Sequence, residues 1–219
     1  MNEPARKLTF TFADFLERER AGDVKHELLN GEICAMARGT IEHGRLASNV
    51  AGVLFAQLRG RPCAAFSSDV LVRVLATGLA TYPDLSVVCG LLERDPEDAN
   101  TIVNPVVLVE VLSDSTEAYD RGEKFAHYQR IPSLKEYVLV SQRSPRIEVF
   151  QRNEDGRSWT LYVAEATEKI ELASIGCEIA VDEIYANALD PVTLSRDAMV
   201  HPGDDRVLKA LLQRGTIRG

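Results

Sequence analysis

The fold is decided by one stretch, Pro105-Val106-Val107-Leu108-Val109-Glu110-Val111-Leu112, an apolar run of strand length that contains one carboxylate. A run this apolar is typical of a strand that is covered on both faces of a sheet. An ionised carboxylate inside such a strand costs several kcal/mol unless a cation or hydrogen-bond donors compensate its charge. Glu110 is therefore the first candidate for a functional residue.

A second carboxylate opens the preceding apolar run, Tyr82-Pro83-Asp84-Leu85-Ser86-Val87-Val88. Asp84 and Glu110 fall on neighbouring predicted strands, so the two carboxylates can share one divalent cation. Oxygen ligands of this kind suit Mg²⁺ or Mn²⁺. A lysine nearby would complete an arrangement that is able to hydrolyse a phosphodiester.

The rest of the chain alternates between helix and strand patterns. Thr11 and Asp14 have the spacing of a capping box, which predicts a helix over residues 9–20. Asn30-Gly31 is the preferred pair for a type I′ turn, which predicts a hairpin over residues 24–37. The other expected elements are helices over 41–58, 120–130 and 181–189, strands over 64–67, 70–75, 136–141, 169–172 and 178–180, a hairpin over 146–163 and a solvated acidic loop over 89–104.

The order of these motifs resembles the PD-(D/E)XK nuclease superfamily, and within it the Uma-two family of restriction-endonuclease-like proteins. Pro83-Asp84 stands for the first half of the superfamily motif and Glu110-Val111-Leu112 for the second half. The resemblance covers roughly residues 8–190. The residues that carry it are Glu27-Leu28-Leu29-Asn30-Gly31-Glu32-Ile33, His43, Pro83-Asp84-Leu85, Val109-Glu110-Val111-Leu112-Ser113-Asp114-Ser115-Thr116, Asp120, Lys124 and Glu136-Tyr137.

The resemblance implies an α/β fold, with a restriction-endonuclease-like mixed β-sheet flanked by helices and an N-terminal β-hairpin. We expect one nuclease domain over residues 1–190. The composition shifts after Asp190, where Pro191, Pro202 and Gly203 interrupt the chain. Residues 191–219 are therefore expected to form a C-terminal tail that is mobile or contacts a partner.

The resemblance also implies metal-dependent hydrolysis of DNA phosphodiester bonds. Asp84, Glu110 and the backbone carbonyl of Val111 would hold Mg²⁺, with Mn²⁺ as the alternative ion. Glu27 would hold a second ion or orient the attacking water. His43, near the start of its helix, is a further candidate for a role in the site.

One position departs from the superfamily pattern, because Leu112 stands where the motif has a lysine. Asp120 and Lys124 are four residues apart on a predicted helix, so they share one face of it. The resemblance favours an arrangement in which Lys124 lies beside Glu110 and stabilises charge on the phosphate or positions the water. The alternative interpretation is a routine surface ion pair between Asp120 and Lys124, with Tyr128 as a core residue of the same helix.

The net charge of −8 is the main objection to a nuclease. Affinity for DNA comes largely from lysine and arginine side chains that neutralise phosphates, although a local basic groove can exist on an acidic protein. Two alternatives therefore stay open. One is a catalytically inactive binding module of the same fold, and the other is a metal-dependent hydrolase of a smaller phosphate ester.

The compartment and partners follow from simpler features. The longest apolar runs fall short of the ~20 residues that span a bilayer, and the first residues lack the apolar core of a signal peptide. We expect a cytoplasmic protein with no membrane contact.

The four cysteines are scattered, which predicts reduced thiols. The expected partners are DNA and a second copy of the chain, since cutting both strands of a duplex suits a two-fold homodimer.

Overall fold

The computed structural model describes residues 9–187. The elements below belong to one unit that ends at Tyr185. The expected C-terminal tail at residues 191–219 lies outside the described residues.

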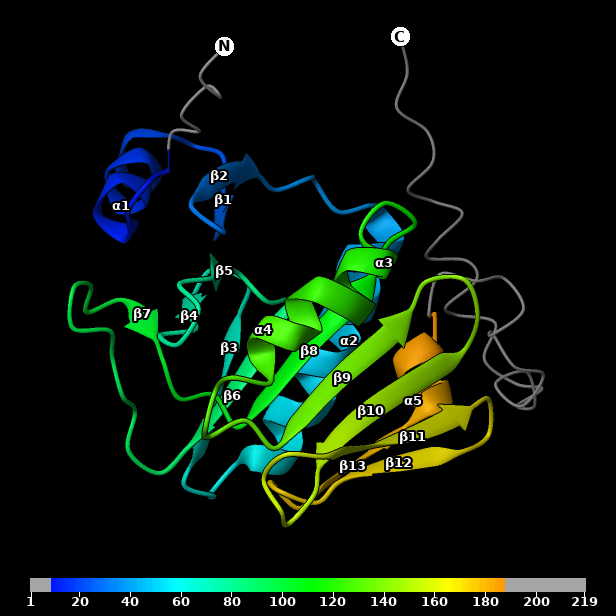
Figure 1. Ribbon diagram of the computed structural model, residues 1–219. Helices are drawn as coiled ribbons and strands as arrows, with labels where there is room; N and C mark the ends of the chain where they lie inside the picture. Colours follow the sequence, from blue (N-terminus) through cyan, green and yellow to red (C-terminus); the bar gives the residue numbers. More distant parts are fainter. Residues whose placement is uncertain (1–8, 188–219) are drawn as a thin grey trace, which may run out of the picture. The chain divides into compact units, whose positions relative to one another are not determined.

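A six-stranded sheet forms the centre of this unit, in the order β11-β10-β9-β8-β6-β3 (Figure 1). β8 pairs parallel with β9 and antiparallel with β6, so the sheet is mixed, as predicted. The strands are β3 (Cys63–Ser67), β6 (Leu85–Cys89), β8 (Val107–Leu112), β9 (Glu136–Ser141), β10 (Arg146–Arg152) and β11 (Trp159–Glu165).

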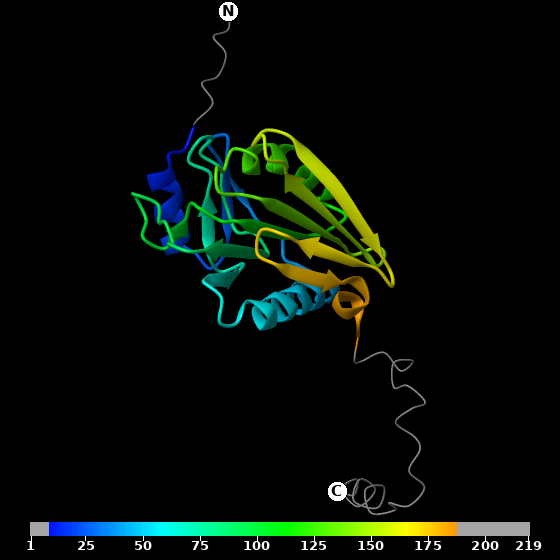
Figure 2. The ribbon, with the colours of Figure 1, turned by 90° about the horizontal axis from the view of Figure 1, so that it is seen from below.

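The two faces of this sheet carry different layers, because side chains alternate along each strand. Val107, Val109 and Val111 of β8 face a core that includes α2 (Ile41–Leu58) and α5 (Val181–Tyr185). The β12–β13 pair completes this layer, and Figure 2 shows α2 and α5 on the same side of the sheet. The bounds of the pair are β12 (Lys169–Leu172) and β13 (Cys177–Ala180).

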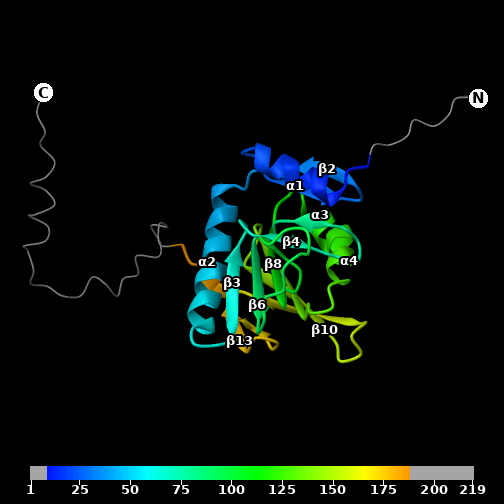
Figure 3. The same ribbon diagram turned by 90° about the vertical axis from the view of Figure 1, so that its left-hand side faces the viewer.

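The opposite face of β8 carries Leu108 and Leu112, with Glu110 between them. It is covered by one helical segment that changes its hydrogen-bonding pattern along its length. Figure 3 shows α2 and this segment on opposite sides of the strands. Its parts are α3 (Glu117–Tyr119), the π-helical turn η1 (Asp120–Lys124) and α4 (Phe125–Tyr128).

A second, five-stranded sheet in the order β2-β1-β5-β4-β7 was not anticipated by the sequence patterns. The predicted turn is confirmed within it, because Asn30 and Gly31 both have positive φ, at 51° and 78°. α1 (Phe12–Ala21) packs on this sheet, and Thr11 and Asp14 form the predicted capping box. The strands are β1 (His26–Leu29), β2 (Glu32–Ala35), β4 (Leu71–Arg73), β5 (Ala80–Thr81) and β7 (Thr101–Ile102).

The expectation of four reduced cysteines is wrong for one pair, because Cys63 and Cys89 form a disulfide. They stand directly opposite each other where β3 pairs with β6. The register of the two strands determines which cysteines pair. Their separation of 26 residues in the sequence does not reveal this pairing. Cys34 is free and exposed, whereas Cys177 is free and buried.

The acidic loop between β6 and β8 is less solvated than its composition predicts. The side chain of Asp95 is fully buried, and its carboxylate lies 3.0 Å from Arg73 on β4. β7 also lies within this segment and pairs with β4. The loop therefore belongs partly to the second sheet.

Within residues 9–187, no helix combines the length and the apolar character that a membrane crossing requires.

Candidate functional site

Asp84 and Glu110 form the centre of the site. Asp84 directly precedes β6, and Glu110 lies on the neighbouring strand β8. The last registered pair is Leu85 with Val109, so Asp84 stands one residue beyond it, opposite Glu110. The Val111 N–H donates to Asp84 Oδ2 at 2.7 Å. The structure thus brings together the two carboxylates that the sequence singled out, and Val111 contacts one of them.

Lys124 reaches this pair from the helical segment above the sheet. Its Nζ lies 2.8 Å from Glu110 Oε1 and 3.1 Å from Asp120 Oδ1. All three side chains are almost fully buried, so the surface ion pair considered as an alternative is wrong. The expected approach of Lys124 to Glu110 is confirmed, and Leu112 packs in the apolar core of the same face.

The π-helical turn η1 explains how the side chains of Asp120 and Lys124 can both be buried against the sheet. A π turn has i→i+5 hydrogen bonds, is rare, and often occurs at functional sites. Asp120 and Lys124 are buried, whereas the intervening Arg121 and Glu123 contact other elements. The sequence predicted an ordinary helix here, and no pattern in it signals the wider turn.

Three tyrosines donate hydrogen bonds within the site, two of them to carboxylates and one to a backbone carbonyl. Tyr128 OH donates to Glu110 Oε1 at 2.8 Å, on the oxygen that Lys124 also contacts. Tyr119 OH donates to Glu27 Oε1 at 2.6 Å, and Tyr137 OH donates to the backbone carbonyl of Asp120 at 3.1 Å. Burial raises the pKa of each of these tyrosines, which keeps their hydroxyl protons in place.

Sequence reasoning treated Tyr128 as a core residue and did not single out Tyr119. The available signal for Tyr128 was its spacing, four residues after Lys124, which places it on the same side of a helix. Tyr119 and Glu27 are far apart in the sequence, so no local pattern links them.

Glu27 lies on β1 and is buried, with 8% of its surface exposed. Its carboxylate is held by Tyr119, next to the turn that carries Lys124. The charge of Glu27 also acts on Lys124, where it favours the protonated amine. Glu27 therefore lies at the edge of the site. Within residues 9–187, it forms no hydrogen bond with Asp84 or Glu110.

His43 approaches the site from the first turn of α2. Its Nε2 lies 3.2 Å from Asp84 Oδ2. This hydrogen bond raises the pKa of His43 above its ordinary value, although burial acts in the opposite direction. The charges of Asp84, Glu110 and Asp120 contribute to the same rise.

The buried charges of the site do not balance. Burial raises the pKa of Glu110 to about 8, with Asp120 and Asp84 acting in the same direction and Lys124 against them. Burial alone would lower the pKa of Lys124, but the charges of Glu110, Asp120 and Glu27 outweigh it and raise the pKa. Lys124 and the neighbouring histidine thus face a larger number of carboxylates, and an added cation would relieve the mutual repulsion of these carboxylates.

The donor set fits a small divalent cation in its chemistry. No donor within the described part of the chain contacts Oδ1 of Asp84 or Oε2 of Glu110, so each carboxylate offers one oxygen. Residues 9–187 contain no cluster of three or more histidine, cysteine, aspartate or glutamate side chains arranged to hold a metal. Mg²⁺ commonly binds through one or two carboxylates and keeps several waters, so a larger cluster is not required.

Comparisons with known proteins identify a family to which the chain is similar. A sequence model of the Uma2 family, described as “Putative restriction endonuclease”, matches residues 12–182. “Uncharacterized protein slr1290” of Synechocystis sp. (strain ATCC 27184 / PCC 6803 / Kazusa) is 38% identical over 172 residues, which cover 78% of this chain and 89% of the relative. “Uncharacterized protein sll1609” of the same organism is 32% identical over 151 residues, which cover 69% of this chain and 85% of the relative.

The fold is also similar to a solved structure. The crystal structure of a “putative nuclease belonging to DUF820” from Anabaena variabilis ATCC 29413 matches with a TM-score of 0.65. The match covers 80% of this chain and 97% of the other, at 16% sequence identity. At this identity the likeness concerns the fold alone, and it confirms the predicted restriction-endonuclease-like α/β architecture.

Proposed function

The chain belongs to the Uma2 family, and from this premise we propose that it is a metal-dependent endonuclease that hydrolyses phosphodiester bonds in DNA. The observation that carries the proposal is the contact between Lys124 and Glu110, beside Asp84. Together with Asp84, this contact provides the two carboxylates and the lysine of the nuclease motif, although the lysine comes from a different element. It therefore speaks against an inactive binding module.

Asp84 and Glu110, together with the Val111 carbonyl, would hold Mg²⁺, with Mn²⁺ as the alternative. When bound, such an ion lowers the pKa of a water molecule and offsets negative charge on the phosphate. Lys124 and Tyr128 share Oε1 of Glu110, which fixes the carboxylate and leaves its other oxygen for the ion.

Lys124 has three N–H donors, and Glu110 and Asp120 accept from it. A third donor is left for a phosphate oxygen or for the attacking water. Because its carboxylate neighbours raise the pKa of Lys124, the amine stays protonated across the neutral range. In this proposal the residue stabilises charge as it develops on the phosphate and does not act as a base.

Glu27 and His43 would have supporting roles. Glu27 would orient the nucleophilic water or hold a second ion at the edge of the site. His43 would hold Asp84 through its hydrogen bond. We further propose that the active form is a homodimer, because two copies of the site would cut both strands of a duplex.

The direct test measures Mg²⁺ and Mn²⁺ binding and the cleavage of plasmid and single-stranded DNA on the same samples. Asp84→Ala and Glu110→Ala should abolish both binding and cleavage. Glu154→Ala, which changes an exposed acid in the turn between β10 and β11, is the matched control and should leave both unchanged. Absence of metal binding at millimolar concentration would overturn the proposal.

A smaller phosphate ester is the second candidate, and the net charge of −8 favours it. An acidic surface weakens attraction to a polyanion but matters less for a small substrate. Bis-(p-nitrophenyl) phosphate, assayed beside DNA, separates the two. Metal-dependent cleavage of this diester without cleavage of any DNA would favour the second candidate.

A further inference from the structure

We propose that Glu148 on β10 is a positioning residue for Lys124, and that it acts through Arg121 on the π-helical turn. Its catalytic consequence rests on the proposed function, but its effect on the placement of Lys124 can be tested without any substrate.

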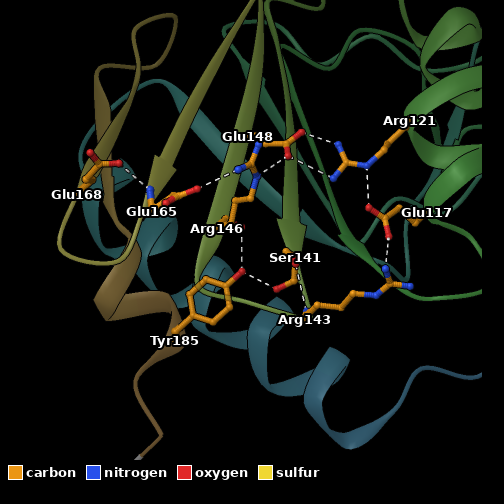
Figure 4. A network of polar contacts seen from close by, with 9 residues as sticks. All are labelled: Glu117, Arg121, Ser141, Arg143, Arg146, Glu148, Glu165, Glu168 and Tyr185. Carbon is orange, nitrogen blue, oxygen red and sulfur yellow. Dashed lines mark hydrogen bonds and ion pairs between the residues drawn. The ribbon is translucent and has the colours of Figure 1, made fainter.

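Glu148 lies on the sheet face that the helical segment covers, and its side chain is only 7% exposed. Arg121 approaches it with two nitrogens, at 2.5 Å from Oε2 and 3.3 Å from Oε1 (Figure 4). Paired contacts of this kind fix direction as well as distance. The neighbouring turn is thereby attached to the middle of β10.

The attached turn is the part of the helical segment that most needs such support. It reads Asp120-Arg121-Gly122-Glu123-Lys124, with a glycine at its centre. Glycine in a helix costs about 1 kcal/mol relative to alanine, and it gives the backbone alternative conformations. Contacts with neighbouring elements must therefore hold this turn in its wide form.

The two outward-facing residues of the turn supply those contacts. Arg121 binds Glu148 on one flank. Glu123 accepts from Asn30 Nδ2 at 2.9 Å on the other flank, at the tip of the β1–β2 hairpin. With both outward corners attached, the inward side chain of Lys124 meets Glu110, and that of Asp120 contacts Lys124.

Glu148 also belongs to a longer network of ion pairs that crosses the sheet (Figure 4). Arg146 donates to Glu148 Oε1 at 2.8 Å and to Glu165 at 3.0 Å. Arg121 donates to Glu117 at 2.9 Å. Glu165 is 65% exposed and does not touch Arg121, so it provides a matched control at the far end of the network.

The test measures the accessibility of Lys124 by acylating the lysines of the full chain with an amine-reactive ester and quantifying each site by mass spectrometry. In the unmodified protein, Lys124 should be protected, whereas the exposed Lys135 reacts freely and serves as the internal reference. Glu148→Gln and Arg121→Gln should each raise the Lys124 rate about tenfold relative to Lys135, because the turn opens more often. Glu165→Gln should leave the ratio unchanged.

Unchanged protection of Lys124 in both variants would overturn the proposal. Should Glu148→Gln fail to fold, Arg121→Lys keeps the test decisive: it retains the charge but loses the paired contact, and it should give an intermediate rate. A nuclease assay on the same variants should show a lower kcat with KM nearly constant, as expected when the lysine and not DNA binding is disturbed. If Lys124 is released while the unmodified protein cleaves neither DNA nor a diester, the positioning role stands and the proposed function fails.

Discussion

The amine of Lys124 lies 2.8 Å from the carboxylate of Glu110, although the residue two positions after Glu110 on the strand is Leu112. The charge that the nuclease motif places on the strand is supplied here by the helix that covers it. Leu112 packs against the apolar side of that helical segment.

Lys124→Leu should lower kcat by roughly 10²–10³-fold, because a positioned charge that stabilises the reacting phosphate is lost. Lys135→Ala removes an exposed lysine and should leave kcat unchanged. The double variant Leu112→Lys/Lys124→Leu should recover part of the loss, since its new amine extends from the same face of β8 as Glu110. Steady-state cleavage of plasmid DNA measures all three, and equal activity of Lys124→Leu and the unmodified protein would contradict the catalytic role of the lysine.

Tyr128→Phe should weaken Mg²⁺ binding by about 10–100-fold, as is usual when a hydrogen bond that orients a ligand is lost. Tyr137→Phe is the matched control, because that hydroxyl donates to a backbone carbonyl and touches no carboxylate of the site. Both changes should cost about 1–2 kcal/mol in the free energy of unfolding. Isothermal titration and urea unfolding separate the two effects, and equal loss of affinity in both variants would mean that Tyr128 has no special role.

The stability of the metal-free protein should fall as the pH rises from about 4.5 to about 8, through the behaviour of Glu110. Its pKa is raised by burial to about 8, from an ordinary value of 4.5. Between these values the folded chain retains a proton that the unfolded chain has lost, so raising the pH favours unfolding. The slope for one full proton is about 1.4 kcal/mol per pH unit. Urea unfolding in EDTA between pH 5 and about 9 measures it, and Glu110→Gln should remove this part of the slope.

Binding of Mg²⁺ should release a proton below pH ~8 and should strengthen as the pH rises to that value, because a ligand must be deprotonated to bind. Titration calorimetry in two buffers with different heats of ionisation counts the protons directly. The same buffers with Glu154→Ala provide the control. Proton release that is zero at pH ~6 would show that Glu110 is not a ligand of the ion.

Much of the fold follows from local patterns in the sequence. The apolar stripe of α2 predicts its bounds, residues 41–58, because one face of that helix packs on the central sheet. The run that forms β8 and the Asn30-Gly31 turn were likewise predictable, since each depends on neighbouring residues alone. The contact between Lys124 and Glu110 was expected chiefly from the family resemblance, since the spacing of Asp120 and Lys124 alone also fits a surface ion pair.

Other features depend on contacts that no local pattern contains. β5 and β7 have two residues each, which is too short for a period, and they form only because longer strands lie beside them. The pairing of Cys63 with Cys89 follows from the register of two strands. The π-helical turn is contacted by Asn30 and Glu148, which lie on either side of it in the sequence and well outside its own segment.

The position of Lys124 on the helical segment determines when, during folding, the site becomes complete. A lysine on the same strand as its acid stands beside it as soon as that strand forms. Lys124 meets Glu110 only after the segment that bears it has packed on the sheet and its turn has been attached to β10. A chain that is still emerging from the ribosome, or one whose helical segment has detached, would hold its acids without their lysine. The activity proposed for the protein would then be the last property gained during folding and the first lost on heating.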